Sequence, residues 1–126
     1  LSTLDPTTRA IVIAGDVDNV VGTEPAKHIW EAMTSLLPGN RDYVLIQSDN
    51  HGKPVLRANH LMPMDAIVGT VNALDWYGPW KLFDGLIACA FDGLACDQAL
   101  GGTPFQEYMG TWSDGTPVNP ALVESA

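Results

Sequence analysis

The chain has 126 residues, of which 46% are hydrophobic and 17% charged, and its formal net charge is −9. This length and composition predict a folded globular chain and exclude an acidic disordered tail. The negative charge excludes nucleic acid and anionic membrane as direct partners, because neither offers a counter-charge. No apolar run approaches the roughly 18 residues that a transmembrane helix needs.

The first half of the chain predicts a strand, a helix and a second strand. Residues 9–14 (RAIVIA) form an apolar, β-branched run that is typical of a strand buried on both faces. A helix is expected from residues 23–25 (TEP), with Thr23 as its N-cap, to residues 38–40 (PGN). Residues 42–47 (DYVLIQ) predict a second buried strand. Because the loops between them are short, the pattern predicts a βαβ unit with two parallel neighbouring strands.

The second half predicts helices, turns and an acidic tail. Two helices, at residues 65–75 and 80–91, are expected on either side of a break at residues 78–79 (GP). From residue 101 onward the turn-rich sequence predicts irregular structure or a short edge ribbon. We expect residues 92–126, which contain no basic side chain, to form an irregular acidic tail packed on the rest.

The two cysteines, Cys89 and Cys96, enclose the six residues AFDGLA. In a secreted protein this spacing suits a local disulfide, and in a cytosolic protein it suits two buried thiols. Zinc is not expected, because two sulfurs with no further His or Cys nearby leave half of its coordination shell empty. The disulfide is the preferred interpretation.

Ionisable side chains follow both predicted strands. Asp16 and Asp18 come after the first strand, and Asp49 and His51 come after the second. Functional groups gather at the carboxyl ends of parallel strands, so an Asp from one loop is expected to reach a His from the next. An Asp that accepts the Nδ1 proton of a His makes Nε2 a general base, which is two thirds of a hydrolytic triad.

The segment around the first acidic loop resembles the C-terminal part of an α/β-hydrolase. In that family the acid lies in a pattern close to G-x-x-D-x-x-V, which residues 15–21 (GDVDNVV) match with Asp18 rather than Asp16 as the acid. The family's His follows the last strand roughly thirty residues later. His51 lies 51 − 18 = 33 residues after Asp18 and is the preferred base.

A second histidine competes with His51 for the role of base. Residues 58–63 (ANHLMP) resemble the A-S-H-x-x-P segment of secreted cutinase-like and polyester-hydrolysing members, which would make His60 the base. His60 is kept as the alternative. The aromatic residues around 78–79 (GP) are expected to pack in the core, with a hydrophobic rim against an acyl chain as the alternative role.

The nucleophile expected from the resemblance is missing, since the 126 residues contain no G-x-S-x-G motif. The resemblance therefore implies the C-terminal portion of an α/β-hydrolase sheet, comprising its last βαβ unit and terminal helices. A missing N-terminal segment would complete it and carry a signal peptide, core strands and the nucleophilic serine. The expected function is hydrolysis of small-molecule or lipid carboxylic esters by a secreted enzyme, without cofactor or metal. The alternative is a non-catalytic binding or interaction domain on the same scaffold.

Overall fold

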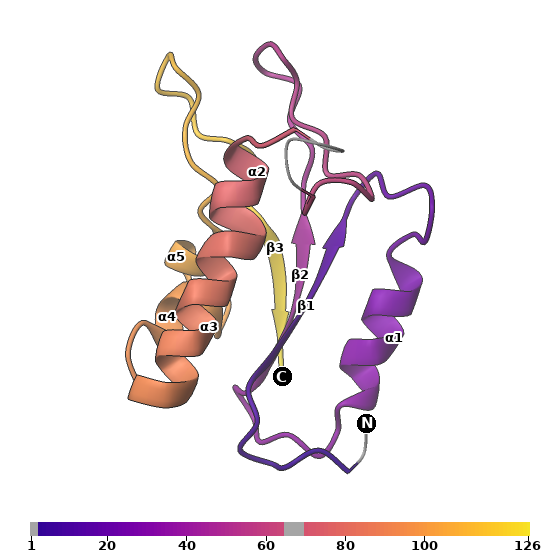
Figure 1. Cartoon of the computed structure of the whole chain (residues 1–126), viewed down its shortest axis with the longest axis vertical. Helices are drawn as coiled ribbons and strands as arrows, with labels where there is room; N and C mark the ends of the chain where they lie inside the picture. Colours follow the sequence, from indigo (N-terminus) through magenta and orange to yellow (C-terminus); the bar gives the residue numbers. More distant parts are fainter. Residues whose placement is uncertain (1–2, 65–69) are drawn as a thin grey trace.

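The computed structural model describes residues 3–64 and 70–126. It is an α/β structure with a small mixed sheet of three strands (Figure 1). In chain order the elements are β1 (Ala10–Gly15), α1 (Glu24–Ala32), β2 (Arg41–Ile46), α2 (Ala73–Asp75), the π-helical segment η1 (Trp76–Trp80), α3 (Lys81–Asp92), α4 (Cys96–Ala99), α5 (Pro104–Glu107) and β3 (Leu122–Ser125).

The sheet has the strand order β1-β2-β3. β1 pairs with β2 in parallel, from Ala10 opposite Arg41 to Gly15 opposite Ile46, which confirms the predicted βαβ unit. β3 then pairs with β2 in the antiparallel direction. Within the part of the chain predicted to be irregular or a short edge ribbon, the structure has the short helix α5 and this edge strand.

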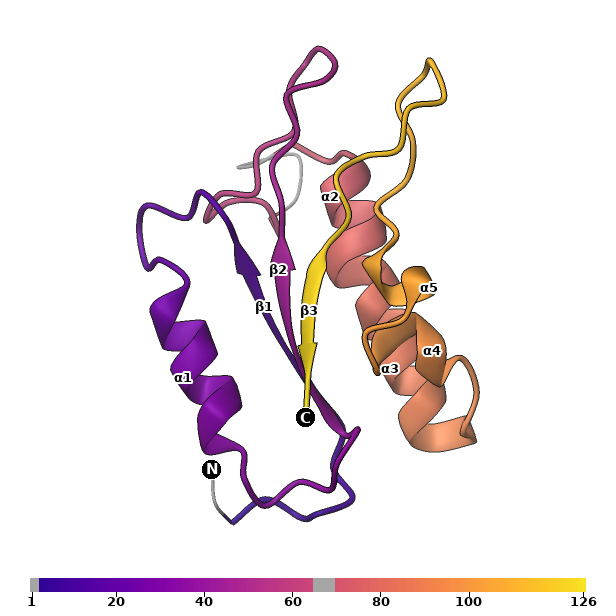
Figure 2. The same cartoon turned by 180° about the vertical axis from the view of Figure 1, so that it is seen from behind.

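The core lies between the sheet and the helices that follow it. α1 lies on one side of the sheet, and the unit formed by α2, η1 and α3 lies on the other (Figure 2). The largest fully buried apolar side chains come from β2, from the helical unit and from the segment before β3, and they include Val44, Ile46, Leu74, Leu82 and Met109. Burying each large side chain of this kind contributes about 1.5–3 kcal/mol to folding.

The two parallel strands differ in burial, although the sequence predicts both to be buried on both faces. β2 fits this expectation because it is flanked by β1 and β3. In β1, residues Ala10 to Ile13 are only partly buried, and Ala14 and Gly15 alone are buried. The reason is position, since β1 lies at one edge of the described sheet.

The helix after β1 begins as predicted but ends early. Thr23 is the N-cap residue and Pro25 lies in the first turn, although the Thr23 side chain makes no capping hydrogen bond. α1 ends at Ala32, well before the residues 38–40 expected to terminate it. Thr34 and Ser35 follow the helix end, and residues of this type favour turns over helix interiors.

The predicted break at Gly78-Pro79 is a kink inside one helical path rather than a gap. α2, η1 and α3 follow one another directly, and only Gly78 has non-helical backbone angles there (φ −85°, ψ −110°). The π-helical turn accommodates the missing N–H and the ring of Pro79. Residues 65–69 of the predicted helix over 65–75 lie outside the described residues. In the described part the helix starts at Ala73, where Asn72 and Asp75 form a capping box.

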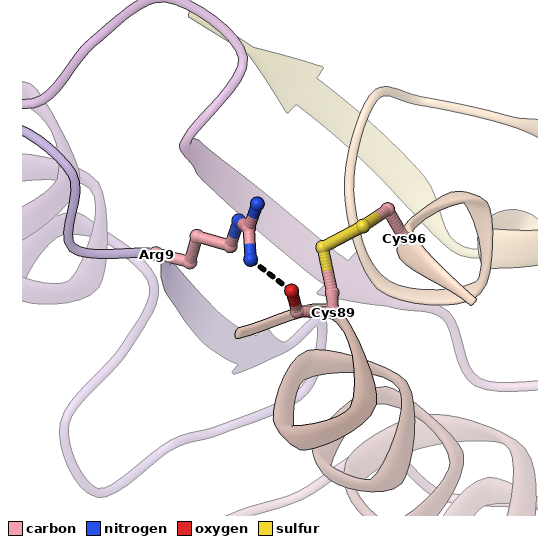
Figure 3. Close-up of a disulfide and its surroundings, with 3 residues drawn as sticks. All are labelled: Arg9, Cys89 and Cys96. Carbon is pink, nitrogen blue, oxygen red and sulfur yellow. Dashed lines mark hydrogen bonds between the residues drawn. A yellow bond between two sulfur atoms is a disulfide. The ribbon is translucent and has the colours of Figure 1, made fainter. Parts of the chain in front are cut away.

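The predicted disulfide joins Cys89 in α3 to Cys96 in α4, which confirms that interpretation. Figure 3 shows the bridge beside Arg9, whose guanidinium donates a hydrogen bond to the backbone carbonyl of Cys89. The bridge therefore lies where the end of α3 meets the residue before β1. It closes the turn between α3 and α4, which contains Gly93 with φ 68° and Ala95 with φ 52°.

Replacing both Cys89 and Cys96 by Ser is expected to lower the free energy of unfolding by about 2–3 kcal/mol, because the cross-link limits the unfolded chain. The loop is short, with a sequence separation of 7, so the effect belongs at the low end of disulfide stabilisation. Urea unfolding of the double variant and the oxidised protein measures the difference. A reduced parent protein that unfolds like the oxidised one would contradict the prediction.

Candidate active site

Asp18 is held firmly in the loop that leaves the carboxyl end of β1. Its Oδ1 accepts hydrogen bonds from the backbone amides of Val20 (2.9 Å) and Val21 (3.0 Å). Its Oδ2 lies 3.0 Å from Nδ1 of His60. The Val21 amide and then the His60 ring lower the pKa of Asp18 to about 2. The side chain is thus an ionised carboxylate of fixed orientation, 14% exposed.

The structure brings Asp18 together with His60, and the preferred contact between Asp18 and His51 is not formed. His60 follows the long loop after β2, and its side chain is 45% exposed. When Nδ1 donates its proton to the carboxylate, the lone pair of Nε2 is free to accept a proton. Nε2 makes no hydrogen bond within residues 3–64 and 70–126. This is the orientation that a general base requires.

The backbone of the His60 segment passes directly over the end of β1. The amide of Val17 donates to the carbonyl of Ala58 (3.2 Å). A Cβ atom on Gly15 would lie only 2.1 Å from the same carbonyl oxygen. The absence of a side chain at Gly15 therefore allows the segment to approach, and this approach sets the distance between His60 and Asp18.

Asp16 positions the same segment through Ser48. The Asp16 carboxylate accepts hydrogen bonds from the Ser48 amide (2.9 Å) and the Ser48 hydroxyl (2.6 Å). The Ser48 Oγ in turn accepts a hydrogen bond from the amide of Ala58 (3.0 Å). Sequence reasoning considered Asp16 only as a rival acid and missed its link with Ser48; a serine directly after the second strand was the available signal.

His51 forms a second and separate pair with Asp114. Its Nε2 lies 2.8 Å from Oδ2 of Asp114, and the two residues come from loops that extend beyond the carboxyl end of the sheet (Figure 1). The His51 ring and then the Thr116 amide lower the pKa of Asp114 to about 2. Because the carboxylate binds Nε2 rather than Nδ1, this pair has the opposite ring orientation to that of a triad.

Asp49, also considered at the sequence level, anchors this second pair. Its Oδ1 accepts from the His51 amide (2.8 Å), and its Oδ2 accepts from Trp112 Nε1 (3.1 Å) and the Asn119 amide (2.9 Å). Burial alone would raise the pKa of Asp49, but the His51 and Asn119 amides bring it below its usual value. Asp49 and His51 therefore tie the loop before His60 to the loop before β3.

Replacing Asp114 by Asn is expected to make the free energy of unfolding depend less on pH in the acid range. The pKa of Asp114 is about 2 in the folded chain and 3.8 as its ordinary value. A lowered folded pKa means that its stabilising contribution is present above pH about 4 and is lost as the pH falls toward 2. Urea unfolding at pH 5, 4, 3 and 2 should show a smaller loss for Asp114→Asn than for the parent chain.

The matched control for that experiment is Asp92→Asn, which removes a carboxylate exposed at the end of α3. Its acid profile should follow that of the parent chain. An Asp114→Asn profile as steep as the parent's would contradict a role for the His51 pair in stability.

Asp18 and His60 share a cavity of about 330 Å³ at the carboxyl end of β1. Its apolar walls come from β1, the loop after it, the segment that carries His60 and Pro79, and they include Ile13, Val21 and Met62. No serine or cysteine is among the described residues that line it. The described residues of the site thus provide an oriented acid–base pair and space for a small group, but no serine or cysteine nucleophile.

Two other features are absent from the part of the chain that the structure describes. Within residues 3–64 and 70–126 there is no group of three His, Cys, Asp or Glu side chains that could hold a metal ion. In the same part of the chain, no helix has the length and apolar character needed to cross a membrane. Comparison with protein families, with curated proteins and with solved structures finds no match to this chain.

Proposed function

We propose that Asp18 and His60 are the acid and the base of a Ser-His-Asp triad that hydrolyses carboxylic esters. The observation that carries the proposal is the 3.0 Å contact from Asp18 Oδ2 to His60 Nδ1, which leaves Nε2 without a hydrogen-bond partner among the described residues, in a residue that lines a cavity. The nucleophilic serine would belong to a polypeptide segment outside these 126 residues. His51, the preferred base at the sequence level, becomes a residue that ties two loops together.

In this reaction His60 takes a proton from the serine and later gives it to the leaving alcohol. Its Nε2 takes the proton of the serine hydroxyl as the serine Oγ attacks the ester carbonyl, and Asp18 stabilises the imidazolium that forms. His60 then returns the proton to the leaving alcohol as the ester C–O bond breaks. A water molecule repeats the sequence on the acyl-serine and releases the acid. Backbone amides of the serine-bearing segment would stabilise the oxyanion.

Two further observations support a more detailed proposal. The sheet topology supports an α/β-hydrolase, and the disulfide supports an extracellular location. The acid follows β1, the base follows the neighbouring parallel strand β2, and functional groups in such sheets gather at this end. We infer that the chain is the C-terminal portion of an α/β-hydrolase domain. The Cys89–Cys96 disulfide is compatible with an extracellular location, and we propose that the protein is secreted.

A fluorophosphonate probe tests the proposal directly, because it forms a stable bond only with an activated serine. The native protein that contains this chain should be labelled, and peptide mapping should place the adduct on a serine outside the 126 residues. His60→Ala should abolish labelling and His51→Ala should retain it. Labelling of a serine within the chain, or labelling that does not depend on His60, would refute the assignment.

A further inference from the structure

A second cavity shares no lining residue with the cavity at Asp18 and His60. It has a volume of about 730 Å³, within the range of small-molecule sites. Six aromatic side chains from η1, α3 and the region of α5 line it: Trp76, Tyr77, Trp80, Phe83, Phe105 and Tyr108. Trp76 is 60% and Phe83 62% exposed, contrary to the core packing that the sequence predicts, whereas Tyr77 is partly buried and packs against the core.

The rings meet at right angles rather than in parallel. Trp76 and Trp80 have centroids 4.6 Å apart and an interplanar angle of 79°. Tyr77 and Tyr108 have centroids 5.3 Å apart and an interplanar angle of 82°. A flat ring needs parallel walls to stack on both sides. In an edge-to-face pair the edge of one ring covers part of the face of the other, so the faces that stay exposed suit a compact, rounded group rather than a flat one.

Two charged side chains line the cavity, and only one is available to a ligand. The ammonium of Lys81 donates to the carbonyls of Phe105 (2.9 Å), Gln106 (2.8 Å) and Tyr108 (2.6 Å), which uses all three of its protons. Burial lowers the pKa of Lys81 to about 8, so the side chain is still mostly protonated at pH 7, with its charge directed at these three carbonyls. The carboxylate of Asp84 lies on the exposed side of α3.

An anionic ligand is therefore disfavoured, because Lys81 has no proton left to donate and the chain has a net charge of −9. A cation is favoured by the same net charge, by Asp84 and by the negative faces of the aromatic rings. We propose that this cavity binds an organic ammonium compound, with a quaternary ammonium group against the perpendicular rings. This site is independent of the proposed esterase function.

Isothermal titration of the full chain with choline tests the proposal. The comparison ligand is the uncharged isostere of choline in which carbon replaces the quaternary nitrogen. Choline should bind about tenfold more tightly, because the two ligands have the same shape and only the cation is attracted to the rings. Amide shifts in a parallel NMR titration should be concentrated at η1, the start of α3 and α5. Equal affinities, or no binding of choline, would overturn the proposal.

Matched variants separate the cavity from the rest of the surface. Phe83→Leu should weaken choline binding about threefold, whereas Phe91→Leu, at a side chain of the same helix that is 83% exposed, should have no effect. Asp84→Asn should also weaken it about threefold and Asp92→Asn should not. All four positions are exposed, so each variant is expected to fold, and NMR spectra verify this. Identical binding by Phe83→Leu and Phe91→Leu would refute the assigned cavity.

Discussion

Asp18→Asn is expected to reduce ester turnover about 10⁴-fold, measured in the protein that includes the serine-bearing segment. The amide that replaces the carboxylate can present an N–H to Nδ1 of His60. The imidazole would then carry its proton on Nε2, where it can no longer accept the proton of the serine. The loss should fall on the turnover number and leave KM little changed, because Asp18 is expected to act through His60 rather than on the substrate.

Two controls make this prediction specific. Asp114→Asn changes the other Asp–His pair in the same way, yet it should leave turnover within a fewfold of the parent value, since His51 faces a different loop. His60→Ala should be at least as damaging as Asp18→Asn, and the double variant should lose little more than His60→Ala alone. A large loss in Asp114→Asn with normal turnover in Asp18→Asn would reverse the assignment of the two pairs.

The effect of Asp18→Asn can also be measured without a substrate. Nitrogen chemical shifts of the His60 ring report which nitrogen carries the proton in the isolated chain. In the parent chain Nδ1 should be protonated, and in Asp18→Asn the proton should move to Nε2. If turnover fell without this change, Asp18 would be acting on something other than the tautomer of His60.

The sequence predicts the βαβ unit because its determinants are local. The apolar run of β1, the Pro in the first turn of α1 and the apolar run of β2 each specify their element within about ten residues. The turn formers after β1 likewise place Asp18 at the carboxyl end of the sheet. The edge position of β1 and its partial exposure were not predictable in this way, since they depend on which strands lie beside it.

The identity of the histidine that meets Asp18 depends on contacts that local patterns do not contain. Spacing favours His51, because it comes soon after the second strand. The structure instead holds His51 against Asp114, which is 63 residues away along the chain. It brings His60 to Asp18 over a separation of 42 residues through backbone contacts of Ala58. The packing of the Ala58 backbone against the end of β1 decides which histidine meets Asp18. The spacing of residue types along the sequence does not reveal this packing.

Gly15→Ala is expected to disrupt the pair at this point of close approach. The new Cβ would lie 2.1 Å from the carbonyl oxygen of Ala58, a backbone atom that cannot rotate away. The segment that carries His60 must therefore move outward, and the hydrogen bond from Val17 to Ala58 must lengthen or break. Overpacking of this kind costs about 1–3 kcal/mol of folding free energy. A displacement of about 1 Å also lowers turnover about 100-fold.

Gly115→Ala separates the local displacement from a general loss of stability. Gly115 has φ +86°, and a Cβ atom added there would have no neighbour within 4 Å, so alanine is strained at this position but meets no other group. It should cost about 1–2 kcal/mol of unfolding free energy and leave the His60 ring signals and turnover unchanged. Gly15→Ala should alter the unfolding free energy, the His60 ring signals and the turnover. If the His60 signals of Gly15→Ala matched those of the parent chain, the contact between Gly15 and Ala58 would not be what sets the distance from His60 to Asp18.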